Sequence, residues 1–463
     1  DILRTFLRHG AEWLPQLQLV HILTDPRIGV REEDALSLLS SFAPSGGDVR
    51  VADVLQYLYL ETSGEAQADE DPIAKMSHDL DMDINTFGRY ESFLAQHFPL
   101  KSRIDETAKR GITLEQLKLV VSFVEHNHFL ADWPWFDTRT WTTKGEKDYK
   151  EFSSINLYHT NSWLLMPATR KEDCAFVELL ATGEQSPKWF CSHWWGEPIK
   201  DFLRCVAKHE EIRKAPEDAS TWAYWVCAYA NRQHSLSSEV TADPMQSSFF
   251  KAMQLADGIF VILDKDATPF TRLWCVFESY VALTSEENRE NRMLVDIGTT
   301  VDESTTALLS DGLSSAEQQI EDQSVAEQLR TCRQAAFPIS VLAKGLRPQL
   351  HEASASVKSD RVHILNSIIG KEAAGLEDEP EASHDAYDKI NRALGGLFAR
   401  AGFERALKER PAEFQDICEA MRDAVDTRSL EFDLRPVNGT DADLAAIGSS
   451  LPPTLERLSV NCA

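Results

Sequence analysis

The chain has 463 residues, of which 43% are hydrophobic and 26% are charged, a composition typical of a soluble globular protein with several domains. Its 74 acidic residues outnumber its 47 basic ones, and the formal net charge of −27 repels nucleic-acid phosphates and anionic lipid. We therefore expect no nucleic-acid partner, although a local positive pocket for a phosphate is compatible with this balance.

No stretch approaches the roughly 20 apolar residues of a membrane span, and no signal-peptide pattern opens the chain. The eight cysteines are scattered without a CxxC pair, which favours reduced thiols in a cytosol-like compartment. We expect a cytoplasmic protein. The numbering begins at Asp1 and not at a methionine, so targeting is left undecided.

Residues 1–60 show helical periodicity, and SFAPSGGDVRVAD resembles an EF-hand loop with Val49 at the inward hydrophobic position. Phe42, Pro44 and Gly46 then occupy ligand positions, which leaves Asp53 as the potential calcium ligand where six or more oxygens are needed. We predict a degenerate EF-hand-like helical module that binds no calcium.

An acidic linker is predicted for 61–80, and a helical region for 81–180. Within that region the Trp-rich stretch 131–165 is expected to wrap another domain as an extended arm.

Residues 185–370 carry short apolar runs, each followed by a helical pattern, which predicts a parallel α/β sheet. The predicted strands are Trp189–Ser192, the run TWAYWVCAYA at 221–230, the run GIFVILD at 258–264 and Met293–Ile297. Proline at the first helical position begins the following helices at Pro198, Pro244 and Pro269. Beyond about 300 the strand signal fades into helical stretches, and no fifth strand is placed.

A helical connector is predicted for 371–425, and the start of a leucine-rich-repeat array for 426–463. Leu430 and Phe432 recur 28 residues later as Leu458 and Val460, with a helical pattern between them. This period suits one strand plus one helix per repeat.

The strongest site candidate is Glu278 in Trp274-Cys275-x-x-Glu278. At 100° per residue, Glu278 lies roughly 40° around the helix from Trp274, on the flank of the buried stripe. A solvated helical glutamate is the structural alternative.

Polar loops after successive strands are expected to meet at the carboxyl edge of the sheet. They are Ser192-His193-Trp194-Trp195-Gly196, Asn231-Arg232-Gln233 and Asp264-Lys265-Asp266. Indole faces beside hydrogen-bonding groups suit an aromatic base and a ribose. Taken singly, His193 could satisfy only its loop, and both tryptophans could be core.

WFCSHWWG resembles the first box of TIR domains, and FTRLWCVFE resembles the TIR segment W-C-x-x-E. WVCAYANRQ resembles the W-I-D-A-L-C-I-N-Q box of HET domains, with Cys227 and Ala230 in place of its Asp and Cys. Together these boxes resemble TIR/HET-like proteins of algae and other protists. The resemblance covers about 185–370 and implies a flavodoxin-like (TIR-like) fold.

The resemblance also implies cleavage of the nicotinamide–ribose bond of NAD in a signalling or stress response, with NAD as substrate and Glu278 as the catalytic residue. Ser192, His193, Trp194, Trp195, Asn231, Gln233, Arg272 and Trp274 would bind the dinucleotide. Self-association is expected, because TIR-like sites are often completed by a neighbouring copy.

A second interpretation is a non-catalytic scaffold that uses the TIR-like and repeat surfaces for protein–protein assembly. Other chemistries lack their motifs, since no GxxxxGK, GxGxxG, HExxH or GxSxG is present. We expect no metal, because Cys191 with His193, and Cys205 with His209, lack a second ligand pair at zinc spacing.

Overall fold

The computed structural model describes residues 13–15, 20, 48–50, 72–239, 241, 243–285, 291–355, 358–424, 429–433 and 440–461. Most of the EF-hand-like module and residues 61–71 of the predicted linker lie outside the described residues. Of that module, β1 (Trp13–Pro15) pairs antiparallel with β2 (Asp48–Arg50), which sets Leu14 opposite Val49. Residues 72–79 of the predicted linker form helix α5, so this part of the linker prediction is wrong.

A six-stranded sheet forms the centre of the molecule, in the order β3-β5-β4-β6-β7-β8. Its strands are β3 (Ile112–Thr113), β4 (Trp189–His193), β5 (Ala223–Trp225), β6 (Gly258–Leu263), β7 (Leu294–Thr300) and β8 (Thr306–Leu309). The four inner strands are parallel, whereas β3 and β8 pair antiparallel at the two edges. The predicted α/β class with a mostly parallel sheet is therefore confirmed.

Both edge strands are absent from the elements predicted above, and the run predicted as one strand at 221–230 forms two elements. Strand β5 ends at Trp225, and Cys227–Ala230 turn into the short helix α12. The loop that begins at Asn231 therefore follows a helix and not a strand. Trp225 in the strand and Tyr229 in the helix are both almost completely buried. The run is therefore apolar throughout, although its secondary structure changes within it.

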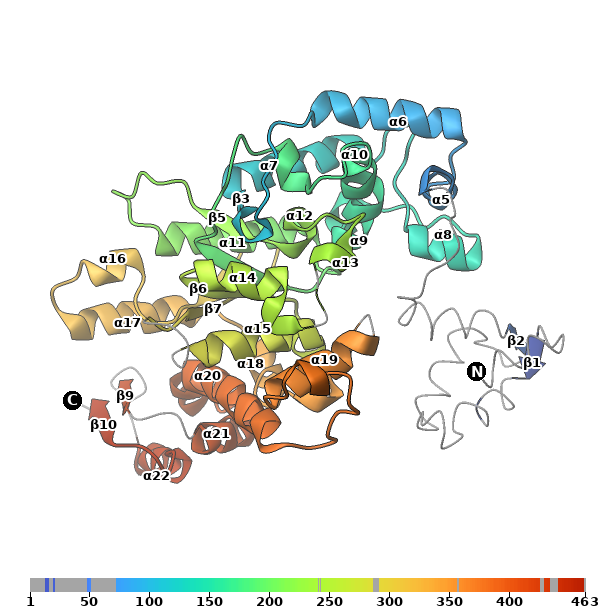
Figure 1. Cartoon of the computed structure of the whole chain (residues 1–463). Coiled ribbons are helices and arrows are strands. Elements are labelled where there is room, and N and C mark those ends of the chain that lie inside the picture. Colours follow the sequence, from blue (N-terminus) through green and yellow to red (C-terminus); the bar gives the residue numbers. More distant parts are fainter. Residues whose placement is uncertain are drawn as a thin grey trace.

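Helices cover both faces of the sheet (Figure 1). The core on one face takes residues from α14 (Ser248–Leu255), α15 (Leu273–Leu283), α18 (Ile339–Lys344), α19 (Lys358–Ile368), α20 (Asp385–Glu409) and α21 (Phe414–Asp423). The core on the other face takes residues from or next to α5 (Pro72–Asp79), α6 (Ile84–His97), α7 (Leu114–Asn127), α8 (Thr138–Lys144), α9 (Leu157–Thr160), α10 (Met166–Thr169) and α11 (Ile199–Arg213). Further helices are α13 (Leu236–Glu239), α16 (Ser315–Gln318) and α17 (Gln323–Gln334). Short 3₁₀ segments include η1 (Thr107–Lys109), η5 (Pro244–Gln246) and η6 (Thr268–Thr271).

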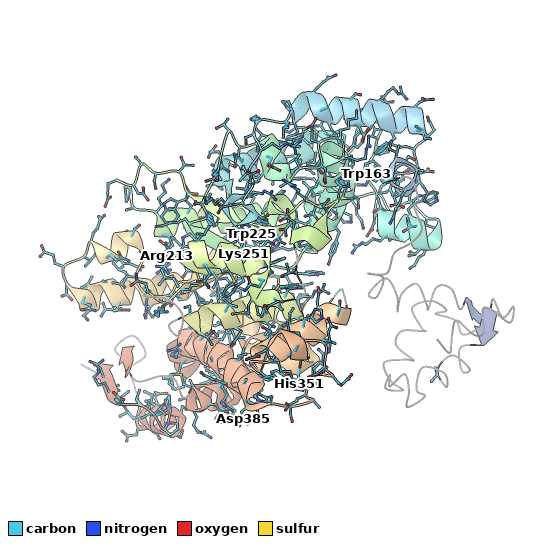
Figure 2. All side chains as sticks on the ribbon, viewed as in Figure 1. Trp163, Arg213, Trp225, Lys251, His351 and Asp385 are labelled. Carbon is cyan, nitrogen blue, oxygen red and sulfur yellow. The ribbon has the colours of Figure 1, made fainter. Side chains whose placement is uncertain are left out.

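The helical region before the sheet shares one hydrophobic core with it. Residues from Met76 to Ala181 pack together with Trp189 and Cys191 of β4. The stretch predicted as an extended arm is folded into this core, because Trp135 and Trp163 expose only 2% and 1% of their surface. Trp163 lies among the N-terminal helices, and Trp225 near the centre of the molecule (Figure 2).

A buried polar network fixes α11 to the sheet. Asp296 of β7 accepts hydrogen bonds from Arg213 Nε at 2.6 Å and from the backbone N–H of Asp311 at 2.8 Å. His209 lies between Asp296 and the Tyr224 hydroxyl, at 3.1 and 3.0 Å. Because α11 follows the loop at the end of β4, this anchor also sets the position of that loop.

The C-terminal residues form a parallel strand–helix–strand unit. Strands β9 (Ser429–Asp433) and β10 (Arg457–Asn461) pair so that Leu430 lies opposite Leu458. Helix α22 (Asp441–Ser450) lies between them in the chain. The register reproduces the 28-residue period, whereas the leucine-rich-repeat array stays a prediction.

Within the described part of the chain, every helix is too short or too polar to span a bilayer.

Candidate functional site

The order of the strands marks one place on the sheet for a ligand. From β4 the chain passes to β5 on one side, and it then returns to β6 on the other side of β4. In open α/β sheets, ligands bind at the carboxyl ends of strands where successive connections diverge in this way. The loops at this position are 194–198 after β4 and 264–268 after β6, and α15 follows the second loop.

Glu278 on α15 is a buried carboxyl without an ion pair among the described residues. Only 4% of its surface is exposed. Its Oε2 is shielded from solvent and has no hydrogen-bond partner among the described residues. Burial raises the pKa of Glu278 to about 8. A strongly perturbed carboxyl at this position is a candidate functional group.

Ser192, at the end of β4, is the polar neighbour of Glu278. Its hydroxyl favours the charged carboxylate and so partly opposes the rise in pKa. By the alternation of strand side chains, Ser192 shares a face with Phe190, which packs in the same core as α15. Its Oγ is itself buried and makes no hydrogen bond of normal geometry within the described residues, so it acts on Glu278 as a nearby polar group that is free to donate to the carboxylate.

Three thiols lie within electrostatic reach of Glu278, namely those of Cys191, Cys227 and Cys275. Burial raises the pKa of each thiol, and the negative charge of Glu278 raises it further. Among the described residues, no cation shifts the pKa of Glu278. The surroundings therefore disfavour its ionised form until a positive group arrives.

The two adjacent tryptophans lie differently. Trp195 donates from Nε1 to the Cys227 sulfur at 3.3 Å and packs against the Tyr158 ring, with ring centroids 5.6 Å apart. Trp194 lies against Gly196, where an added Cβ would come 2.1 Å from the indole. A side chain at position 196 would therefore displace the Trp194 ring.

The remaining predicted residues are engaged by nearby elements. Asn231 Oδ1 accepts from the Ser248 hydroxyl at 2.9 Å, and Gln233 Nε2 donates to Ala228 O at 3.0 Å. Trp274 donates to Asp360 Oδ2 at 2.8 Å and stacks on Phe249. Half-buried Arg272 precedes α15, and its charge partly offsets the rise in the pKa of Cys275 that burial causes.

Of the predicted site residues, the structure thus gathers Glu278 and Ser192, with Trp195 linked to them through Cys227. Asn231, Gln233 and Trp274 form other contacts, to α14, α12 and α19.

Glu197, the residue before Pro198, is a buried carboxyl that is not among the site residues predicted from sequence. Both of its carboxyl oxygens are buried without a hydrogen-bond partner among the described residues, and 4% of its surface is exposed. His193 lies four residues earlier, and its Nε2 is also buried without a hydrogen-bond partner among the described residues. An acidic residue in the loop after β4 was a usable signal, but its weight depends on a strand order that sequence does not reveal.

A cavity of about 310 Å³ lies elsewhere, between α20, α21 and the segment that follows α18. Its lining is charged, with Arg347, Asp388 and Glu419 among the contributing residues. Glu278 is not among the residues that line this cavity. Within the described residues, no three His, Cys, Asp or Glu side chains are arranged to hold a metal ion.

No family model, curated protein or solved structure matches the chain. The chemistry available at the site therefore follows from its residues. A neutral carboxyl in a shielded environment donates a hydrogen bond, and once ionised it stabilises a nearby positive charge more strongly than it would in water.

Proposed function

We propose that residues 185–370 form a TIR-like, flavodoxin-like domain that cleaves the nicotinamide–ribose bond of NAD, with Glu278 as the catalytic residue. The observation that carries this proposal is the buried Glu278 carboxyl, which forms no ion pair with a described residue and lies next to Ser192, near the carboxyl ends of β4 and β6.

The reaction develops positive charge on the ribose. As the bond from C1′ to the pyridinium nitrogen breaks, the electron pair leaves with nicotinamide, which departs neutral and needs no proton. The ribosyl group becomes oxocarbenium-like until water adds at C1′ and releases a proton. A carboxylate placed against this centre lowers the barrier by electrostatic stabilisation.

Glu278 suits this role because its charge depends on its surroundings. Without ligand, a pKa of about 8 keeps most of the carboxyl protonated at neutral pH. The positive nicotinamide ring of NAD favours ionisation, so the carboxylate forms where the substrate brings positive charge. Ser192 then stabilises the charged form, and Trp195 is held near Cys227 by the hydrogen bond from its Nε1.

The test measures nicotinamide release from NAD by chromatography with the purified chain. Glu278→Gln keeps the size of the side chain and removes its charge, so release should fall at least a hundredfold. Ser279→Ala is the matched control, because the Ser279 hydroxyl bonds to Cys275 O on the same helix at 2.8 Å. Equal turnover in wild type and Glu278→Gln rejects the proposal.

A scaffold is the second candidate function. The C-terminal strand–helix–strand unit, in which β9 pairs with β10, supports it through exposed apolar side chains. Leu444 of α22 and Leu458 of β10 leave 46% and 43% of their surface exposed. Gel filtration should then show assembly, and NAD should leave the melting temperature unchanged. A micromolar stabilisation by NAD contradicts this alternative.

A further inference from the structure

Glu197 and His193 are buried polar groups at the end of β4 that the chemistry at Glu278 does not use. Their side chains are 4% and 7% exposed, and the Glu197 carboxyl oxygens and His193 Nε2 lack hydrogen-bond partners among the described residues. Leaving a buried donor or acceptor unsatisfied costs its full desolvation, so each such group in a native protein calls for an explanation.

The surroundings of Glu197 are negative. Burial raises its pKa well above the usual range, and the charges of Asp201 and Asp264 raise it further. Asp264 already accepts from Thr268 N and Oγ1, both at 2.7 Å, and Asp201 pairs with Arg204 at 3.3 Å. This field opposes direct contact of a phosphate or a carboxylate with the Glu197 carboxyl and favours an uncharged polar group there.

His193 complements this neutral carboxyl. Burial lowers the pKa of His193 to about 4, so its ring is neutral at physiological pH. His193 is the last residue of β4 and its ring contacts Phe202 of α11, whose first turn follows Glu197. The loop between them closes through a hydrogen bond from Glu197 N to Trp194 O at 3.1 Å. Together the two side chains offer unpaired hydrogen-bonding atoms without net charge.

We infer that Glu197 and His193 form a subsite for a vicinal diol, the chemistry of a ribose ring. A diol is neutral, presents two O–H donors and two acceptor oxygens, and thus matches a protonated carboxyl and a neutral imidazole. The location agrees, because Glu197 and Asp264 belong to the two loops at which the connections of the sheet diverge. Which ribose it takes rests on the proposed function: Glu278 takes the nicotinamide ribose, and this subsite takes the adenosine ribose.

The experiment compares binding of ADP-ribose and of its 2′-deoxyadenosine analogue by calorimetry. The wild-type chain should bind ADP-ribose at least tenfold more tightly than the analogue. Glu197→Leu should abolish this discrimination. Glu197→Gln should largely retain it, since an amide is also a neutral donor and acceptor. Loss in Glu197→Gln equal to that in Glu197→Leu would overturn the subsite in this form.

Glu210→Leu is the matched control. Glu210 lies near the other end of α11 and also has a buried Oε2 without a hydrogen-bond partner among the described residues. This variant should discriminate as the wild type does. Where Glu197→Leu fails to fold, His193→Phe supplies the second test, because it keeps a ring against Phe202 and removes Nε2. Unchanged discrimination in His193→Phe, or no binding of ADP-ribose to the wild type, overturns the inference.

Glu278→Gln separates this inference from the proposed function. It should abolish nicotinamide release and leave the discrimination between the two ligands intact. Discrimination that depends on Glu197 in a chain without NAD cleavage would reject the proposed function alone. Cleavage in a chain whose discrimination ignores Glu197 would reject the subsite alone.

Discussion

The indole of Trp274 donates a hydrogen bond of 2.8 Å to Asp360 Oδ2, which joins α15 to α19 across 86 positions of sequence. Trp274 also stacks on Phe249 of α14, with ring centroids 4.7 Å apart. One turn further along α15, Glu278 lies without an ion pair in the described part of the chain. The same helix therefore carries an anchoring residue and a candidate catalytic residue.

Trp274→Phe tests the anchoring role. It removes the hydrogen bond to Asp360, whose pKa burial already raises, so we expect a loss of about 1–2 kcal/mol of unfolding free energy. The rate of NAD cleavage should change little. Urea denaturation and the nicotinamide assay check both values, and a large loss of turnover in a stable variant would place Trp274 in the site.

Glu278→Gln should stabilise the protein increasingly as the pH rises. In the folded chain Glu278 titrates at about 8 instead of its ordinary 4.5, so folding takes up a proton between these values. The unfolding free energy of the wild type therefore falls by up to roughly 1.4 kcal/mol per pH unit across that window. Urea denaturation at pH 5 and pH 8 measures the difference between wild type and variant. A difference independent of pH would show that Glu278 is not protonated in the folded state.

NAD cleavage should rise with pH until Glu278 is ionised. If the carboxylate is the active form, kcat/KM climbs about tenfold per pH unit and levels off above about 8. The groups facing Glu278 are the Ser192 hydroxyl and the thiols of Cys191, Cys227 and Cys275. Ser192→Ala should move the profile to higher pH, because the hydroxyl favours the charged carboxylate. A profile unmoved by Ser192→Ala contradicts this coupling.

Gly196→Ala should disturb the loop after β4. The new Cβ would lie 2.1 Å from the Trp194 ring, so the indole must move. We expect weaker ADP-ribose binding and a modest loss of stability. Gly183→Ala is the control, because nothing lies within 4 Å of its added Cβ. Calorimetry and thermal melting of both variants decide, and equal behaviour of the two would mean that the position of Trp194 does not matter.

Asp296→Ala should destabilise the chain by about 3–5 kcal/mol, because it leaves Arg213 and His209 buried without their shared partner. Arg347→Ala should cost less than about 1 kcal/mol, since Arg347 is 58% exposed and pairs with surface carboxylates. Chemical denaturation at neutral pH compares the two. Similar losses in both variants would contradict the anchoring of α11 through Asp296.

By itself the sequence determined the elements whose patterns are local. The uninterrupted apolar run of β6 predicts a strand buried on both faces, and the spacing of Phe270, Leu273 and Phe277 predicts the buried stripe that begins at η6 and continues through α15. The edge strands β3 and β8 were missed because two to four residues carry too little periodicity.

Tertiary structure alone decided which polar side chains are paired and which are left over. Trp274 finds Asp360, and Asp296 finds Arg213, across distances in sequence that no motif encodes. Glu197 is a candidate binding residue only in the folded chain, where the strand order places its loop beside that of Asp264 and burial shields its carboxyl from water. Periodicity reflects neighbours along one element, whereas desolvation and hydrogen bonding depend on atoms from all of them, so the chemical state of Glu278 and Glu197 is a property of the folded chain.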